Sequence, residues 1–132
     1  MNELRIVIPG NPPSINHVYR NVAINRRITT ADGQKWRQNV QAIAARVIAT
    51  QGWKTSTEEK LVAEVMIYWP TKRKRDVENV GKLLWDALEG IVYENDRWLL
   101  PRYMDFTVDK HNPRVEIRFY RMEEATDVLH RL

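Results

Sequence analysis

The hydrophobic residues of this chain follow two different spacings in turn, and this alternation restricts the folds that the chain can adopt. Around residues 4–8 and over 61–69, apolar and polar residues alternate, which predicts strands, because successive side chains of a strand point to opposite faces. Over 30–51 and 77–90 the apolar residues recur every three or four positions, which predicts amphipathic helices. The first four elements are therefore strand, helix, strand and helix.

Two more alternating runs, at 104–108 and 115–119, predict a final pair of strands. The turn-forming sequence His111-Asn112-Pro113 separates them, so we expect an antiparallel hairpin. The full order of strand, helix, strand, helix, strand, strand indicates an α+β fold, a single domain with a mixed β-sheet and two main helices. Residues 12–28 show no sustained period and are not assigned, although three apolar residues in this stretch would permit a short hairpin.

The length of the chain, 132 residues, suffices for one hydrophobic core and not for two. We assign residues 1–121 to one domain and 122–132 to a C-terminal tail, whose apolar spacing is compatible with a short helix. No apolar run reaches the length of a membrane-spanning helix, and the first residues lack a secretory signal pattern. We therefore expect a cytoplasmic protein that has no membrane partner.

The composition of the chain restricts its metal and partner chemistry. The chain contains no cysteine, and its three histidines show no zinc-type spacing, so a bound metal would be held mainly by oxygen. The net charge is +4, and residues 72–75 form an unbroken basic run that precedes an acidic pair. Positive charge favours an acidic partner, most commonly nucleic acid, although such a run is also usual in a solvated loop.

The segment that begins the second helix carries the candidate chemistry. Asp76 and Glu78 are two positions apart where a strand and a loop lead into this helix, so both carboxylates can point to one divalent cation. Mg²⁺ prefers oxygen ligands and retains several waters, so it suits a site of two or three carboxylates that also accepts a phosphate. Lys82 lies one turn beyond Glu78 on the same face, where it can neutralise charge on a phosphodiester oxygen.

Each of these residues also has a purely structural explanation. Asp76 is a favourable helix N-cap, and Glu78 with Lys82 matches the ordinary i,i+4 ion pair of a solvated helix face. Asp86 continues the same stripe, and we expect it to hold the following loop through hydrogen bonds. Asp96 stands in a polar turn, where aspartate commonly stabilises the turn itself. The spacing alone leaves both explanations open.

The wider pattern resembles the RusA family of Holliday junction resolvases. The resemblance rests on Arg75-Asp76-Val77-Glu78-Asn79, Lys82, Asp86-Ala87-Leu88, the acidic turn at 93–96, and an opening stretch with Pro9, Pro12-Pro13-Ser14, Asn16 and Tyr19-Arg20. It extends from residue 3 to about residue 120. Family resemblance supplies what the spacing alone does not, namely a reason to prefer the catalytic explanation.

The resemblance implies a set of site residues. Asp76, Glu78 and Asp96 would bind Mg²⁺, or Mn²⁺ in its place, and Lys82 would assist catalysis. The family has aspartate at the position of Glu78. It usually has paired acids in the later turn, whereas here Asn95 precedes Asp96, so Glu94 is an alternative third ligand. The residues that we expect to contact the DNA backbone are Arg26, Arg27, Lys72, Arg73, Lys74, Arg75 and Arg97.

Two tryptophans lie near these charged residues. Trp69 ends a predicted strand beside the basic run, and Trp98 is close to Asp96. Packing in the core is the default for both, and stacking on bases exposed at a DNA branch is the alternative. His17 is assigned to hydrogen bonding within a loop rather than to a catalytic base.

The function that the resemblance implies is an endodeoxyribonuclease of a bacterium, phage or prophage that resolves four-way DNA junctions in recombination and repair. It would hydrolyse phosphodiesters by paired, metal-dependent nicks and would have no small-molecule substrate. A two-fold homodimer with one site in each subunit meets the need for two matched nicks. Two other functions stay open: a non-catalytic DNA-binding module, and a nuclease for flaps or other branched DNA.

Overall fold

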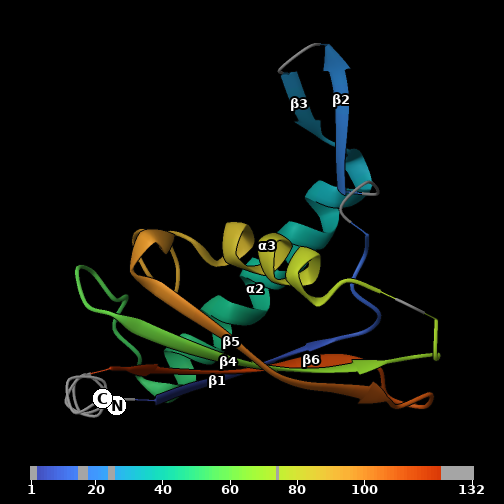
Figure 1. Ribbon diagram of the computed structural model, residues 1–132. Coiled ribbons are helices and arrows are strands. Elements are labelled where there is room, and N and C mark those ends of the chain that lie inside the picture. The colour runs from blue at the N-terminus through green and yellow to red at the C-terminus, as the bar shows by residue number, and fades with distance from the viewer. Residues whose placement is uncertain (1–2, 15–17, 24–25, 74, 123–132) are drawn as a thin grey trace, which may run out of the picture.

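Residues 3–14, 18–23, 26–73 and 75–122 are described in a computed structural model, in which two helices cover one face of a four-stranded sheet (Figure 1). The strands of this sheet are β1 (Glu3–Pro9), β4 (Leu61–Trp69), β5 (Leu99–Val108) and β6 (Arg114–Arg121). The helices are α2 (Ala31–Gln51) and α3 (Val77–Leu88), and a short 3₁₀ turn, η1 (Asp96–Trp98), precedes β5. The predicted α+β class and the order of these elements are confirmed.

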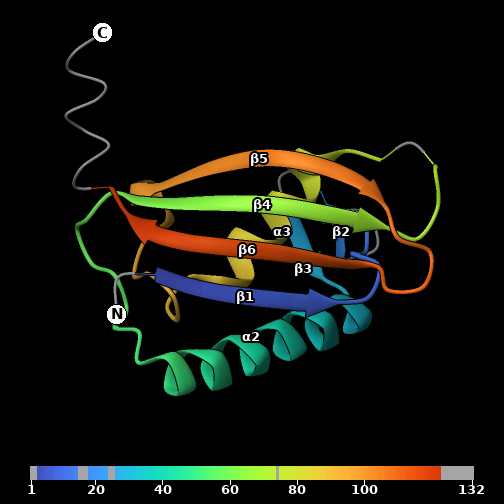
Figure 2. The same cartoon turned by 90° about the horizontal axis from the view of Figure 1, so that it is seen from below.

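The sheet is mixed, with the strand order β1-β6-β4-β5 (Figure 2). β6 is antiparallel to both of its neighbours, whereas β4 and β5 run parallel. The predicted hairpin of the last two strands is therefore wrong, because β4 lies between β5 and β6. Turn residues predict that the chain reverses but not how many strands it passes. Helix α3 returns the chain for a parallel strand beside β4, and β6 then pairs on the other side of β4.

Capping residues fix both ends of α2. The hydroxyl oxygen of Thr30 accepts a hydrogen bond of 3.0 Å from the backbone N–H of Gly33, as expected of an N-cap. Gly52 ends the helix in the left-handed conformation at φ 69°, and its N–H donates to the carbonyl of Ile48 over 2.9 Å. The helix predicted over 30–51 with a glycine stop is confirmed.

The core lies between the helices and the sheet. Alternate residues of β1 and β6 are buried, so these strands present one face to the helices. Seven of the 12 residues of α3 are buried, whereas most residues of β5, at the sheet edge, are exposed. The buried residues of α3 pack in the core and hold the helix in place. The backbone that carries the side chains on its outer face is therefore held in a fixed position.

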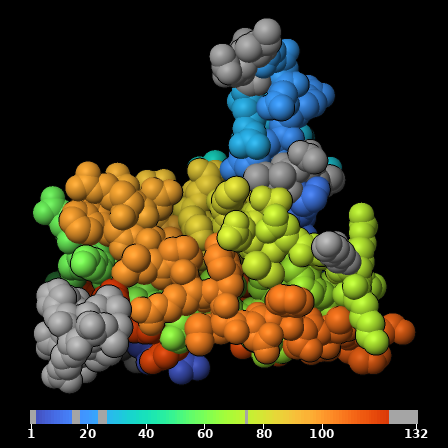
Figure 3. Space-filling view, viewed as in Figure 1, coloured from blue at the N-terminus to red at the C-terminus, as the bar shows by residue number. Residues whose placement is uncertain are grey.

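A second, two-stranded antiparallel sheet of β2 (Tyr19–Ala23) and β3 (Arg26–Thr29) stands apart from the main body, and we call it the arm (Figure 3). This is the hairpin that the unassigned stretch permitted. Its base is fixed at Val18, whose carbonyl accepts hydrogen bonds from the N–H and the hydroxyl of Thr30 at 2.8 and 3.1 Å. Gly33 permits this close approach, because a Cβ there would lie 2.5 Å from the carbonyl oxygen of Val18.

The tail predicted over 122–132 lies, apart from Met122, outside the described residues. Among the helices of the described ranges, none is both long and apolar enough to cross a membrane.

Candidate active site

The first turn of α3 carries the two neighbouring candidate acids. Asp76 is the N-cap, and its Oδ1 accepts hydrogen bonds from the N–H groups of Glu78 at 2.9 Å and Asn79 at 3.3 Å. Its other carboxylate oxygen makes no hydrogen bond to the described part of the chain. Asp76 and Glu78 are both exposed. The capping explanation is thus correct for Asp76, yet capping leaves one of its oxygens open to a ligand.

Glu78 and Lys82 do not form the ordinary helical ion pair. The salt bridges of the described residues lie elsewhere, and neither of these two side chains takes part in one. Both side chains are exposed on α3. The structural explanation for this pair therefore has no support, and both charges remain open to an outside partner.

The third candidate acid lies at the other end of α3. The N–H of Asp96 donates to Oε1 of Glu89, the C-cap residue of the helix, over 3.4 Å. Glu78 and Glu89 are roughly 16 Å apart along the axis at the helical rise per residue. Glu94, the alternative ligand, is in the same loop as Asp96, where its N–H donates to the carbonyl of Ser56. Within the described ranges no three acidic or histidine side chains gather closely enough to hold a metal.

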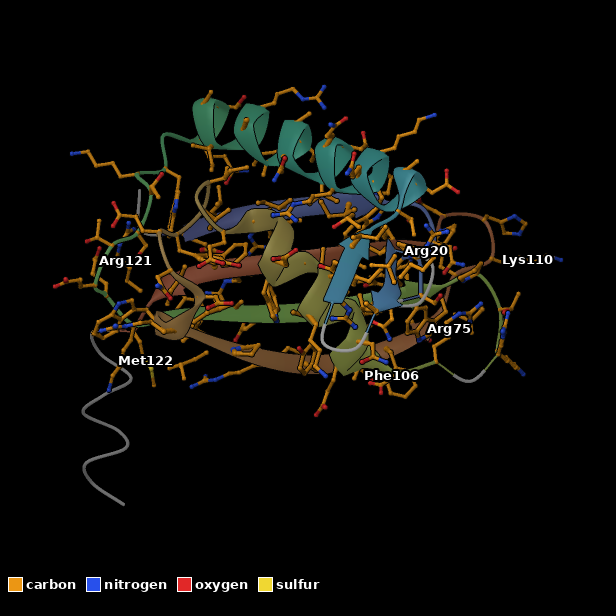
Figure 4. The ribbon with its side chains drawn as sticks, turned by 90° about the horizontal axis from the view of Figure 1, so that it is seen from above. Arg20, Arg75, Phe106, Lys110, Arg121 and Met122 are labelled. Carbon is orange, nitrogen blue, oxygen red and sulfur yellow. The ribbon has the colours of Figure 1, made fainter. Side chains whose placement is uncertain are left out.

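The loop from β4 to α3 holds the predicted basic run. Arg75 packs over the Trp69 ring at 5.0 Å from its centroid and donates to the carbonyls of Thr71 and Arg73 at 3.2 and 3.0 Å. Its guanidinium therefore organises the loop, while Lys72 and Arg73 are exposed. Figure 4 places Arg75 at the same end of the molecule as two further basic residues, Arg20 and Lys110. Lys74 and the side chain of Arg26 lie outside what the structure describes.

The two tryptophans proposed for base stacking differ in exposure. Trp69 is 4% exposed and belongs to the core, so the stacking alternative is wrong for it. Trp98 is half-buried at the other end of α3, and Arg97 lies over its ring at 5.0 Å from the centroid. Arg97 thus accompanies Asp96 rather than the basic loop. His17 is outside the described residues.

Asp86 holds the arm rather than the loop that follows it, so its predicted partner was wrong. Its Oδ2 accepts a hydrogen bond of 2.7 Å from the hydroxyl of Tyr19 and lies 3.0 Å from the guanidinium of Arg37 on α2. Burial, together with the bond to this carboxylate, raises the pKa of Tyr19 to about 12, so its hydroxyl stays protonated. The sequence gives the stripe on α3 but cannot show that a residue 67 positions earlier meets it.

Sequence reasoning also missed an exposed apolar strip on β5. Alternation marked a strand without showing that it lies at the sheet edge. Phe106 pairs with buried Ile67 and so points to the helix side of the sheet, beside the first turn of α3 (Figure 4). Phe106 and Met104 are each 59% exposed. The strip consists of Leu100, Met104, Phe106 and Val108. It follows the edge of the sheet rather than one face, because Phe106 and Val108 pair with residues on the helix side and Leu100 pairs with Val62 on the other side.

The donors at the first turn of α3 suit a hard cation. Mg²⁺ is usually held by one or two carboxylates, and waters and substrate phosphates complete its coordination. Asp76 and Glu78 offer carboxylate oxygens that are solvent-accessible and have no cationic partner in the described residues. The pair can therefore hold Mg²⁺ against a phosphate, with the Lys82 ammonium one turn away.

The chain is similar over most of its length to known nucleases. A profile of the family described as endodeoxyribonuclease RusA matches residues 9–120, which include the arm, α2, α3 and the final strands. The crossover junction endodeoxyribonuclease of Enterobacteria phage HK97 is 35% identical over 88 residues, which are 67% of this chain and 68% of that protein. The protein of the same name from Escherichia coli K12 is 33% identical over 88 residues, with the same coverage. The corresponding protein of Enterobacteria phage 82 is 34% identical over 90 residues, again with that coverage.

The match covers both candidate ends of α3, and three relatives from phages and a bacterium share the same described activity. The predicted resemblance is confirmed: the chain belongs to the family of RusA endodeoxyribonucleases.

Proposed function

We propose that this protein resolves four-way DNA junctions by Mg²⁺-dependent hydrolysis of phosphodiester bonds. The observation that carries the proposal is the pair of exposed carboxylates, Asp76 and Glu78, on the first turn of a helix whose other face is buried in the core. Family membership makes the chain a nuclease. Its relatives come from phages and bacteria, so we propose a phage or prophage protein that acts on DNA in the bacterial cytoplasm.

The roles of the residues follow from their positions. Asp76 and Glu78 would hold Mg²⁺, which when bound supplies positive charge to the phosphoryl group and lowers the pKa of water. Lys82 would place its ammonium beside the phosphate and stabilise the extra negative charge of the transition state. Lys72 and Arg73 would bind the backbone leading to the site, since both are exposed on the loop that enters α3.

A homodimer would complete the acidic set. Asp96 lies at the end of α3 opposite to Asp76 and Glu78, so one chain does not bring the three acids together. A two-fold axis beside β5 would place two copies of this edge strand antiparallel. The end of β5 that flanks the paired acids would then meet the start of the second β5, which follows Asp96 of the partner subunit. Two such sites, related by symmetry, also provide the two matched nicks.

The edge of β5 has properties that suit contact with a second copy. Its apolar strip would be covered in such a dimer, and large exposed apolar side chains commonly mark interaction surfaces. Arg102 and Asp105 both lie on the face of the sheet away from the helices, opposite Glu64 and Met66. In an antiparallel pair centred between them, each arginine would face the partner's aspartate. Pro101 lacks an N–H, so side chains rather than a continuous hydrogen-bond ladder would make most of this contact.

Cleavage of a panel of DNA substrates tests the function. Labelled four-way, three-way, flap and linear duplex DNA are incubated with the protein in Mg²⁺, in Mn²⁺ and in excess chelator. We expect paired symmetric nicks in the four-way junction, with both metals and not with chelator. Preference for flaps would assign the second nuclease function, and junction binding without cleavage in any metal would assign the non-catalytic module.

A further inference from the structure

One carboxylate, that of Asp86, connects the arm to α3. Asp86 of α3 accepts a hydrogen bond of 2.7 Å from the Tyr19 hydroxyl on β2 and forms an ion pair of 3.0 Å with Arg37 of α2. The second guanidinium nitrogen of Arg37 also donates to the backbone carbonyl of Asp86 over 3.5 Å. Three elements that are distant in sequence thus meet at this side chain. The carboxylate is 41% exposed, so the contact lies at the surface where DNA can approach.

Few contacts among the described residues fix the orientation of the arm. Four of the five residues of β2 are exposed, and none of the described side chains of β2 and β3 is buried. Besides the Tyr19 bond, the contacts among the described residues that hold the arm to the body lie at its base, between Val18 and the start of α2. Tyr19 directly follows Val18 at this base, and its bond to Asp86 attaches the β2 side of the base to α3. Without this bond only the contacts to the start of α2 would remain among the described residues, and the arm would be free to tilt relative to α3.

Arg27 is held by the same tyrosine. Its guanidinium carbon lies 4.5 Å from the centroid of the Tyr19 ring, within the range of a cation–π contact. Tyr19 and Arg27 are on the same face of the arm, because Asn21 pairs with Arg27 and is two positions from Tyr19. That face is turned to α3, as the bond to Asp86 requires. Arg27 is exposed and forms no ion pair within the described residues, so its charge is open to a phosphate.

We propose that Tyr19 and Asp86 are positioning residues that fix Arg27 above α3, where it binds one backbone phosphate at a set distance from the bond that is cut. This proposal rests on the proposed function. Asp86 is eight residues beyond Glu78, which corresponds to roughly 12 Å along α3. A DNA strand advances 3.4 Å per phosphate along the helix axis, so the contact falls about three to four phosphates from the cut. The arm thus determines where the nuclease cuts relative to the branch.

Tyr19→Phe tests the anchor, because it removes one hydroxyl and keeps the ring under Arg27. We expect this variant to cut four-way junctions at several adjacent bonds instead of one position on each strand, with a severalfold lower single-turnover rate at the main position. Tyr120→Phe is the matched control, since the Tyr120 hydroxyl also donates to a carboxylate, that of Glu64, over 3.1 Å. Tyr120 lies on the face of the sheet away from the helices. This control should cut as the unmodified protein does.

A phosphate scan identifies the contact itself. Junctions that carry one neutral methylphosphonate at successive positions are cut under single-turnover conditions. The unmodified protein should lose cleavage when the neutral linkage is about three to four phosphates from the cut. Arg27→Ala should lose this position-specific sensitivity, and Tyr19→Phe should spread it over neighbouring positions. Asp86→Asn should cut more narrowly than Asp86→Ala, because an amide oxygen still accepts from Tyr19.

The outcomes separate this proposal from the proposed function. If Tyr19→Phe cuts at the same positions and with the same phosphate sensitivity as the unmodified protein, the anchor has no positioning role although the nuclease assignment stands. If Tyr19→Phe and Tyr120→Phe lower the melting temperature equally and leave the cutting pattern unchanged, Tyr19 is merely structural. If the unmodified protein cuts no branched DNA, both the function and the positioning role are wrong.

Discussion

The two ends of α3 carry different parts of the candidate chemistry. At the N-terminal end Asp76 and Glu78 stand together beside an exposed basic loop, and capping explains why the acids suit this position. At the C-terminal end Asp96 bonds to Glu89 and is accompanied by Arg97. The helix that holds both ends rigidly also keeps them apart. The proposed set of three acids would therefore need a second subunit, because the described residues of one chain do not bring them together.

Asp76→Asn should have one of the largest effects on cleavage, because it removes a negative charge at the N-terminal end of α3 and keeps the shape of the side chain. Asparagine caps helices as well as aspartate does, so α3 should keep its first turn. Loss of a carboxylate that holds the cation should reduce cleavage by roughly a thousandfold, which corresponds to several kcal/mol of transition-state stabilisation. Single-turnover cleavage of a four-way junction measures this, with junction binding as the control. Cleavage at the unmodified rate would remove Asp76 from the site.

Variants of Glu78 separate the effect of side-chain charge at the N-terminal end of α3 from the effect of side-chain length. Glu78→Gln should lose about a hundredfold in cleavage, because a neutral amide is a poor substitute for a carboxylate on Mg²⁺. Glu78→Asp should keep substantial activity, since it retains the charge, and Glu78→Ala should be inactive but folded. No ion pair with Lys82 is lost in these variants. Rates across a Mg²⁺ titration decide the matter, and a fully active Gln variant would make Glu94 the next acid to test.

Phe106→Glu tests whether the two ends meet across a dimer. A charge in the apolar strip of β5 should weaken self-association and reduce cleavage by about tenfold or more at protein concentrations where the unmodified chain is dimeric. Light scattering and cleavage are measured on the same samples. Val7→Glu is the matched control, because Val7 is 47% exposed on β1, at the opposite edge of the sheet. Equal effects of the two substitutions, or a monomeric unmodified protein on junction DNA, would contradict the proposed arrangement.

Neutralising the basic loop should have the smallest effect on the chemistry. Lys72→Ala combined with Arg73→Ala should weaken junction binding and reduce the slope of log affinity against log salt by about 1.8, at 0.9 per phosphate contact. The cleavage rate of the saturated complex should change only severalfold. Fluorescence anisotropy at several salt concentrations measures the slope. An unchanged slope would show that DNA approaches α3 from another side.

The sequence predicted those parts of the fold that are determined locally. Both helices and the strands β1 and β4 follow from hydrophobic period and from caps such as Thr30 and Gly52. The sequence was compatible with the hairpin of the arm but did not predict it, because the residues of β2 are mostly exposed and show no apolar period. The pairing of β5 was wrong for a related reason. Alternation identifies a strand but does not say which neighbour it has, and here the crossover through α3 decides this.

The candidate site shows the same limit. Motif spacing placed Asp76 and Glu78 together because both belong to one turn of one helix. The position of Asp96 relative to them depends on the length of α3 and on the loop after it, so spacing in sequence gave no distance. The predicted partner of Asp86 was wrong, because its actual partner, Tyr19, lies on a hairpin whose sequence shows neither a helical period nor a buried apolar pattern. Contacts between distant segments were therefore the part that the sequence left undetermined.

Mixing two inactive variants tests most directly whether the two ends of α3 act together across a dimer. Asp76→Asn and Asp96→Asn proteins, each expected to be inactive alone, are dissociated and reassociated together, and nicking of a four-way junction is measured. If each site takes Asp76 and Glu78 from one subunit and Asp96 from the other, half of the sites in a mixed dimer contain no substitution. With such a shared site, the mixture should regain single nicks without paired cuts. If the mixed dimers form and remain as inactive as the separate variants, the shared site is contradicted.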